Sequence, residues 1–132
     1  MKQRIGLASA VALALTLAVV SAQTPPAITR TVLQKQDISI PGREAVIAKA
    51  GIPGNGGTTG RHTHPGEEIS YVVDGTLTLE VDGQPAKMLK GGDVFIIPAG
   101  TVHNATNKSA ASATVIANYI VEKGKPLTTP VK

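Results

Sequence analysis

Hydrophobic and polar residues alternate with a period of two along most of the chain, which is the pattern of strands with one buried face. Glycine, proline and aspartate separate these segments at short, roughly even intervals. Besides a histidine-containing stretch, the segments with a strand pattern are 31–40, 43–52, 69–73, 76–81, 84–89, 94–97, 102–106 and 114–122. No segment after residue 22 has a convincing amphipathic helix pattern. The sequence therefore predicts an all-β sandwich or barrel with about eight to ten strands.

The first 22 residues differ from the rest of the chain. They begin with two basic residues, Lys2 and Arg4, and continue with an apolar run over 5–20. This pattern predicts a secretory signal peptide over 1–22, cleaved after Ala22, and an exported protein that is periplasmic or secreted. The alternative is a retained membrane anchor, but the apolar run is shorter than the roughly 20 residues that a span needs. We therefore expect no membrane partner after cleavage.

The remaining residues are enough for one domain. We expect a proline-rich extended arm over 23–30, a barrel over 31–122 and a loose polar tail over 123–132. The full chain has 13 basic and 9 acidic residues, for a net charge of +4. Removal of Lys2 and Arg4 with the signal peptide leaves 11 basic and 9 acidic residues, scattered along the chain. This small excess gives no reason to expect nucleic acid as a partner.

Cysteine is absent, so the chain has no disulfide and no thiolate for catalysis or metal binding. Any metal must therefore be held by nitrogen and oxygen ligands. The aromatic residues Tyr71, Phe95 and Tyr119 are few, and the core is expected to be aliphatic. This composition argues against a stacking platform for flat aromatic ligands or bases.

The candidate chemistry lies in the histidines, all three of which fall within two segments of the chain. His62 and His64 are two residues apart, so on an extended strand both side chains leave the same face. Pro65-Gly66 allows a sharp turn, after which Glu68 begins a new apolar run. Imidazole and carboxylate are common ligands of divalent metals. Two ligands on one strand and a third on the next can converge on one point, which predicts a metal site.

These residues also form two sequence motifs that resemble those of the cupin superfamily. The first, G-x5-H-x-H-x3-E-x6-G, is matched by Gly56, His62, His64, Glu68 and Gly75. The second, G-x5-P-x-G-x2-H-x3-N, is matched by Gly92, Pro98, Gly100, His103 and Asn107. No motif position is missing, and the 16 residues between the two motifs suit a short, single-domain member.

The resemblance implies a small double-stranded β-helix, or jelly-roll, barrel that forms a homodimer. It also implies one divalent metal ion, bound by His62, His64, Glu68 and His103. Such a ligand set suits Zn, Cu, Ni, Mn or Fe and discriminates poorly among them. The motif glycines and Pro98 are interpreted as turn residues, and Asn107 as a residue that caps a loop through side-chain hydrogen bonds.

Strand parity indicates which side chains surround the site. Ser70 and Val72 share the parity of Glu68, and Ala105 shares that of His103, so we expect these three residues to line the cavity. Their small and aliphatic side chains favour a compact small-molecule ligand or substrate. Parity does not decide whether Tyr71 or Phe95 faces the cavity, because the strand register near Pro98 is uncertain.

Two functions remain open. The first is a metal-dependent enzyme of the dioxygenase, isomerase or lyase type, acting on a small oxygen-rich molecule, in which Glu68 doubles as the catalytic proton carrier. The second is a non-catalytic module that binds a metal or a ligand. The complete ligand set favours the enzyme, whereas the scarcity of other acidic or basic groups favours the module. The neighbouring Glu67 has the opposite parity and is expected to point away from the metal.

Overall fold

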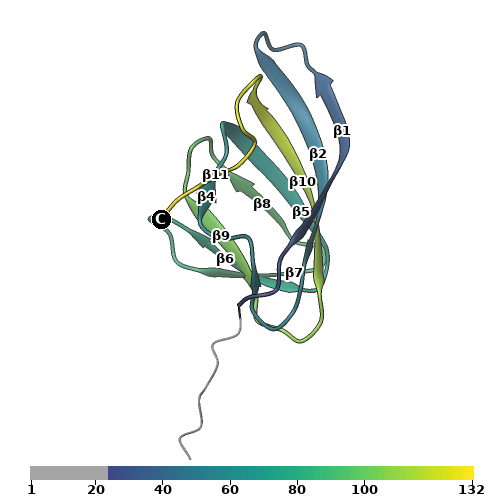
Figure 1. The fold of residues 1–132 in the computed structure, drawn as a ribbon, viewed down its shortest axis with the longest axis vertical. Helices are drawn as coiled ribbons and strands as arrows, with labels where there is room; N and C mark the ends of the chain where they lie inside the picture. Colours follow the sequence, from purple (N-terminus) through teal and green to yellow (C-terminus); the bar gives the residue numbers. More distant parts are fainter. Residues whose placement is uncertain (1–23) are drawn as a thin grey trace, which may run out of the picture.

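The computed structural model describes residues 24–132, and the predicted signal peptide lies outside them. Within this range the chain forms eleven strands joined by turns and loops (Figure 1). Their bounds are β1 Thr29–Asp37, β2 Arg43–Ile52, β3 Gly57–Thr58, β4 His62–Thr63, β5 Gly66–Asp74, β6 Thr76–Val81, β7 Lys87–Lys90, β8 Val94–Ile97, β9 His103–Asn107, β10 Ala113–Glu122 and β11 Thr129–Pro130. No helix in the described part of the chain is long and apolar enough to cross a membrane.

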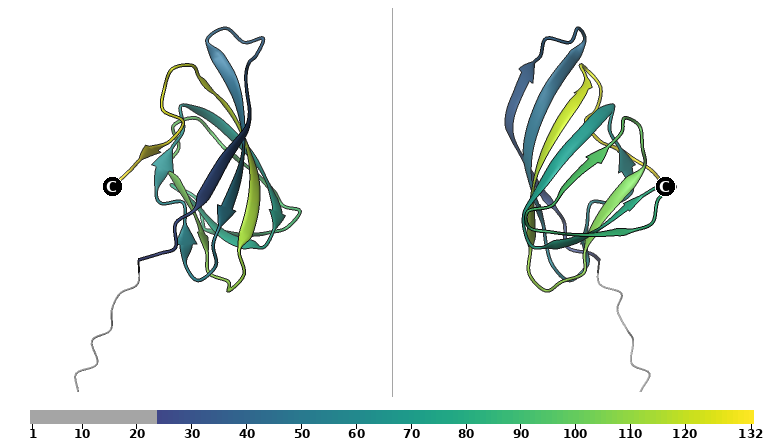
Figure 2. Two further views of the ribbon diagram at one scale, coloured as in Figure 1. Left: turned by 45° about the vertical axis from the view of Figure 1, so that its right-hand side comes forward. Right: turned by 180° about the vertical axis from the view of Figure 1, so that it is seen from behind.

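The strands form two antiparallel sheets that face each other across the interior (Figure 2). One sheet has the order β1-β2-β10-β5-β8. The other has the order β11-β4-β9-β6-β7, and β3 pairs with β9 beside this path. Neighbours in a sheet are rarely neighbours in the chain, so the chain crosses repeatedly from one sheet to the other. The predicted all-β, double-stranded β-helix barrel is confirmed.

The alternating sequence pattern builds the interior directly. Burial alternates along the whole of β10, and Val115, Ala117, Tyr119 and Val121 all point inward. The facing positions of β2 are also buried and include Ala48 and Ala50. Because alanine fills little space, these inward positions leave room for a cavity between the sheets. The predicted strands 43–52, 76–81 and 94–97 coincide with β2, β6 and β8.

The N-terminal strand differs from the prediction at both ends. β1 begins at Thr29, so two residues assigned to the extended arm belong to the sheet. Arg30 pairs with Ala50, and paired residues of antiparallel strands point to the same side, here the interior. β1 ends at Asp37 rather than at residue 40, because the chain turns there and the Arg43 amide bonds to the Ile40 carbonyl.

The expected loose tail is in fact paired with the barrel. β11 pairs with β4, with Pro130 opposite His62, and the Val131 amide donates a hydrogen bond of 2.9 Å to the Arg61 carbonyl. β4 would otherwise leave one edge unpaired, and backbone pairing satisfies its polar groups. Such pairing needs no hydrophobic alternation, so the polar, proline-containing sequence of the tail gave no sign of it.

Candidate metal centre

Four side chains far apart in the sequence meet in the interior of the barrel. His62 lies on β4, His64 directly after it, Glu68 on β5 and His103 on β9, so both sheets contribute. His62 pairs directly with His103 across the β4–β9 ladder. One ligand atom from each of the four residues lies within 4.8 Å of the others, and all four side chains are buried. The structure thus brings together the complete set of predicted ligands.

The turn between β4 and β5 makes this convergence possible. At Gly66 a Cβ atom would lie 1.9 Å from the Ile120 carbonyl oxygen, so only glycine lets β5 start this close to β10. The Gly100 amide donates a hydrogen bond of 3.0 Å to the His64 carbonyl. The turn at Gly100, in the second sequence motif, is therefore hydrogen-bonded to the backbone of the first motif at His64.

Each of the three imidazoles is oriented by a backbone carbonyl. Nδ1 of His62 donates to the Gly60 carbonyl at 2.7 Å, Nδ1 of His64 to the Leu127 carbonyl at 2.6 Å, and Nδ1 of His103 to the Thr101 carbonyl at 3.0 Å. A carbonyl can only accept, so each Nδ1 carries the proton. In a neutral ring Nε2 then bears a lone pair. Hydrogen bonds of this kind fix the tautomer and the ring orientation of metal-binding histidines.

The three Nε2 atoms and the Glu68 carboxylate face one another. Nε2 of His62 lies 3.1 Å from Nε2 of His64, and Oε2 of Glu68 lies 3.0 Å from Nε2 of His64 and 3.2 Å from Nε2 of His103. In the neutral tautomers these contacts set lone pair against lone pair, and a positive charge among them relieves the repulsion. A divalent cation satisfies all four groups at once, and the donor set therefore fits a metal ion.

The electrostatics favour the ligand forms of His62 and Glu68. Burial lowers the pKa of His62 to about 4, which favours its neutral imidazole at neutral pH. Burial alone would raise the pKa of Glu68, but His103 and His64, whose Nε2 atoms donate to its carboxylate when the rings are protonated on both nitrogens, and the hydrogen bond from Ser70 lower it well below its usual range. Ser70 Oγ donates to Glu68 Oε1 at 2.6 Å, which leaves Oε2 turned toward the imidazoles.

A cavity adjoins the four ligands. Its volume, counted as the space open to the centre of a water molecule, is about 30 Å³, which is room for roughly two or three waters. His62, Glu68 and His103 form one part of the wall, and the remainder is mainly aliphatic. The other lining residues are Arg30, Ala50, Ile52, Thr59, Leu77, Leu79, Phe95, Ala105, Val115, Ala117 and Tyr119.

The predicted lining residues have different positions. Ala105 lies in the cavity wall. Ser70 and Val72 are buried on the same inward face but do not line the cavity, because Ser70 is hydrogen-bonded to Glu68 and Val72 packs in the core. Phe95 lines the cavity, whereas Tyr71 is 45% exposed on the outer face.

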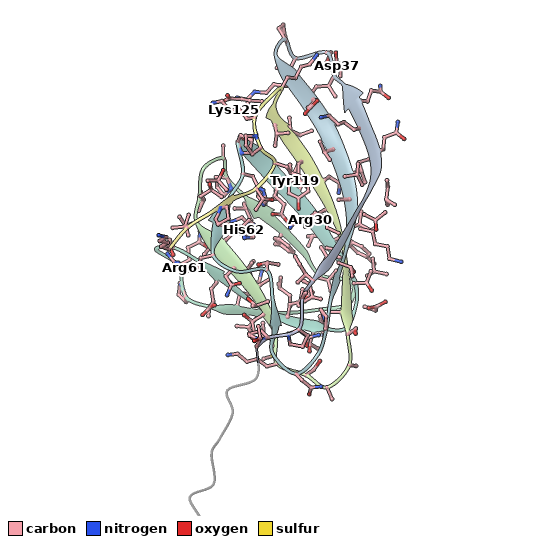
Figure 3. The ribbon with its side chains drawn as sticks, in the orientation of Figure 1. Arg30, Asp37, Arg61, His62, Tyr119 and Lys125 are labelled. Carbon is pink, nitrogen blue, oxygen red and sulfur yellow. The ribbon has the colours of Figure 1, made fainter. Side chains whose placement is uncertain are left out.

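Two ionisable residues of the cavity wall were not predicted from the sequence. Tyr119 packs its ring against His64, with ring centroids 4.7 Å apart, and burial together with the charge of Glu68 raises the pKa of its hydroxyl. The inward parity it shares with Ala117 could have identified it. Arg30 lay in the segment assigned to the arm, so no parity argument was available for it. Figure 3 shows Arg30, Tyr119 and His62 close together between the sheets.

The remaining motif residues serve the backbone. Asn107 donates hydrogen bonds to the carbonyls of Ile52 and Ala111, while its Oδ1 accepts from the amide and the hydroxyl of Ser109, which is a loop cap. Gly75 has a φ of +80°, and a Cβ there would lie 2.6 Å from Ala113. The other motif glycines with positive φ are Gly56, Gly92 and Gly100. Pro98 accepts a hydrogen bond from the Thr101 amide in the turn before His103.

Comparison with known proteins agrees with this geometry. The sequence model of the cupin domain matches residues 49–122, which is more than half of the chain. The protein therefore belongs to the cupin family. A germin-like protein of Arabidopsis thaliana, subfamily 2 member 1, is 39% identical in an alignment covering 48% of this chain and 32% of the relative. The chain thus spans about a third of the length of that relative.

Solved structures share the fold. A cupin domain from Bordetella pertussis has a TM-score of 0.61 at 25% identity, with 75% of this chain and 98% of that chain covered. A double-stranded β-helix protein from Klebsiella pneumoniae has a TM-score of 0.64 at 18% identity, with coverage of 82% and 90%. The DMSP lyase of Ruegeria pomeroyi has a TM-score of 0.63 at 20% identity, with coverage of 79% and 51%.

Proposed function

We propose that this cupin binds one divalent metal ion through His62, His64, Glu68 and His103 and acts as a metal-dependent enzyme on a small oxygen-rich molecule. The observation that carries the proposal is the orientation of the three imidazoles. His64 and His103 direct Nε2 toward the Glu68 carboxylate, and His62 directs Nε2 toward that of His64. Three backbone carbonyls enforce these orientations. A set of histidines that served only as core residues would have no reason to place three lone pairs around one carboxylate.

The reaction type is proposed to be that of a dioxygenase, an isomerase or a lyase. A metal bound here supplies a Lewis acid that polarises a substrate oxygen. The chain itself supplies a mainly aliphatic cavity that limits water around the substrate, and the Tyr119 hydroxyl as a hydrogen-bond donor. Glu68 is first of all a ligand. Its role as a proton carrier requires that the hydrogen bond from Ser70 opens, because this bond contributes to the lowering of its pKa.

Export would constrain the metal. A chain secreted unfolded takes up its metal outside the cytosol, where zinc and copper compete by intrinsic affinity. We therefore expect protein isolated from the periplasm to carry zinc, copper or nickel, and stoichiometric iron or manganese would contradict this expectation. Export itself rests on the sequence of residues 1–22.

The alternative is a non-catalytic module that binds a metal or a ligand. It is favoured by the cavity wall, in which Arg30 and Tyr119 are the ionisable residues besides the ligands. Screening small oxygenated compounds under air and under nitrogen discriminates the two functions. Turnover that requires the metal supports the enzyme, whereas saturable binding without turnover supports the module.

The experiment that tests the metal centre compares two adjacent glutamates. Glu68 is buried in the ligand set, whereas Glu67 is exposed on the same strand. Elemental analysis should find one metal ion per chain in the wild type and in Glu67→Ala. Glu68→Ala, His62→Ala and His103→Ala should lose most of it. A wild-type protein that carries no metal and takes none up on soaking would overturn the proposed function.

We also propose that the protein forms a homodimer. Its support is an exposed apolar patch on the outer face of β5 and β8. The patch consists of Ile69, Tyr71, Val73, Val94 and Ile96, which are 43–65% exposed. Across the two strands Ile69 pairs with Ile96 and Tyr71 with Val94, so the side chains form a continuous surface. β8 is also an edge strand of its sheet, which leaves a free edge beside the patch.

A further inference from the structure

The guanidinium of Arg30 lines the interior cavity and has no ionic partner within residues 24–132. Its Nη1 donates to Thr128 Oγ1 at 3.1 Å, but its Nε is buried without a hydrogen-bond partner. Among the described residues, no carboxylate pairs with it. The exposed Arg61 provides a contrast, since its two terminal nitrogens bind both oxygens of Asp82 at 3.0 and 2.9 Å. A guanidinium whose Nε is buried without a partner is unfavourable unless its hydrogen bonds are completed.

Arg30 pairs with the inward-pointing Ala50, so its positively charged side chain lies on the side of the strand that faces the metal centre. Both residues line the cavity that also contains His62, Glu68 and His103. Tyr119 is in the same wall, and in the described part of the chain its hydroxyl makes no hydrogen bond. With a divalent ion in place, the cation and Arg30 together outweigh the single negative charge of Glu68. An anion is therefore the ligand that the charge balance of the cavity favours.

The geometry points to a carboxylate-binding subsite formed by the guanidinium of Arg30 and the hydroxyl of Tyr119. The inference rests on the proposed metal centre and names its substrate class, a small carboxylate of a few heavy atoms. The planar fork of arginine matches the two oxygens of a carboxylate, and a phenol adds a third donor. The other side chains of the wall are mostly aliphatic and the cavity is narrow, so the remainder of the ligand must be short.

Acetate and its neutral analogue acetamide are the probes, because they have nearly the same shape and differ in charge at pH 7. Each is titrated into the zinc-loaded and the metal-free full-length protein, and binding is followed by protein NMR. The variants are Arg30→Gln and Tyr119→Phe. Lys49→Gln is the matched control, because it removes the same charge from the neighbouring strand β2 at an exposed position.

Acetate is expected to saturate one site and to bind roughly tenfold or more tightly than acetamide. Arg30→Gln should weaken acetate binding roughly tenfold, and Tyr119→Phe severalfold, whereas Lys49→Gln should change it less than twofold. Equal affinity for the two probes, no saturation by acetate, or equal effects of Arg30→Gln and Lys49→Gln would overturn the subsite. If Arg30→Gln folds poorly, the comparison of the two probes on the metal-free wild type decides the matter, because acetate has no zinc ion to bind there.

Titration of acetate into the metal-free protein distinguishes failure of the proposed metal centre from failure of the carboxylate subsite. A protein that binds no metal but holds acetate through Arg30 would refute the metal centre and support the subsite. A protein that binds one zinc ion but shows no dependence of acetate binding on Arg30 would leave the metal centre standing and refute the subsite.

Discussion

His64 Nδ1 donates a hydrogen bond of 2.6 Å to the carbonyl oxygen of Leu127, which is 63 residues away near the C-terminal end of the described chain. Leu127 lies just before β11, which pairs with β4 beside the site. The C-terminal segment thus fixes the tautomer of a candidate metal ligand. Thr128, the next residue, accepts a hydrogen bond from Arg30. One short segment therefore supports both the metal centre and the proposed carboxylate subsite.

Deletion of residues 126–132 is predicted to weaken metal binding while the barrel stays folded. His64 loses its orienting acceptor, and loss of such a partner typically lowers metal affinity by roughly 10–100-fold. Zinc affinity is measured by competition with a chelator, and the fold is checked by circular dichroism. The control is Leu127→Ala, which keeps the carbonyl and should retain near-wild-type affinity. Equal affinities of the deletion variant and the wild type would show that the hydrogen bond does not matter for binding.

Removal of the metal is predicted to lower the melting temperature. A metal that binds only the folded state stabilises it by about 4 kcal/mol when its free concentration is 1,000 times the Kd. For a domain of this size, this corresponds to a drop of roughly 10 °C or more on chelation. Calorimetry with and without chelator measures the shift. In Glu68→Ala the chelator should have no effect, and a similar shift in both proteins would point to a site elsewhere.

Side-chain parity predicted the ligand-bearing strands well, but it did not predict what the N-terminal and C-terminal segments contribute to the site. It placed Glu68 inward and Glu67 outward, and both positions are as expected, because a strand offers only two faces. It gave no information on Leu127, whose contribution to the site is a backbone carbonyl that any residue carries. Arg30 was hidden because the first strand begins within a segment whose prolines suggested an irregular arm.

Acid is predicted to destabilise the metal-free protein from about pH 6.5 downward through His62. The pKa of His62 is lowered to about 4, whereas an unfolded histidine has its pKa near 6.5. Between these values the unfolded state binds more protons, so stability is lost as the pH falls from about 6.5 to 4, by on the order of 3 kcal/mol. The lowered pKa of Glu68 adds a further loss below about pH 4.5. Urea unfolding at several pH values measures both effects.

The same shift changes the pH at which the metal is released. If all ligands were imidazoles of ordinary pKa, protonation would make metal occupancy fall below about pH 6. Because the pKa of His62 is lowered to about 4, protons compete with the metal for this imidazole only near pH 4. Release of the metal is therefore expected to extend from about pH 6 down to 4. Occupancy measured by elemental analysis after dialysis tests this range. Complete release above pH 6 would show that protonation of His62 does not govern it.

A positive charge in the apolar patch of β5 and β8 is predicted to dissociate the proposed homodimer. Ile96 is 65% exposed and lies opposite Ile69 within the patch, and a lysine there would bury an unpaired charge in the interface. Ile96→Lys should raise the dimer dissociation constant roughly 100-fold or more. Sedimentation equilibrium measures it, with Met88→Lys as control, since Met88 is 75% exposed on β7 of the other sheet. A wild-type protein that stays monomeric at high micromolar concentration would refute the dimer.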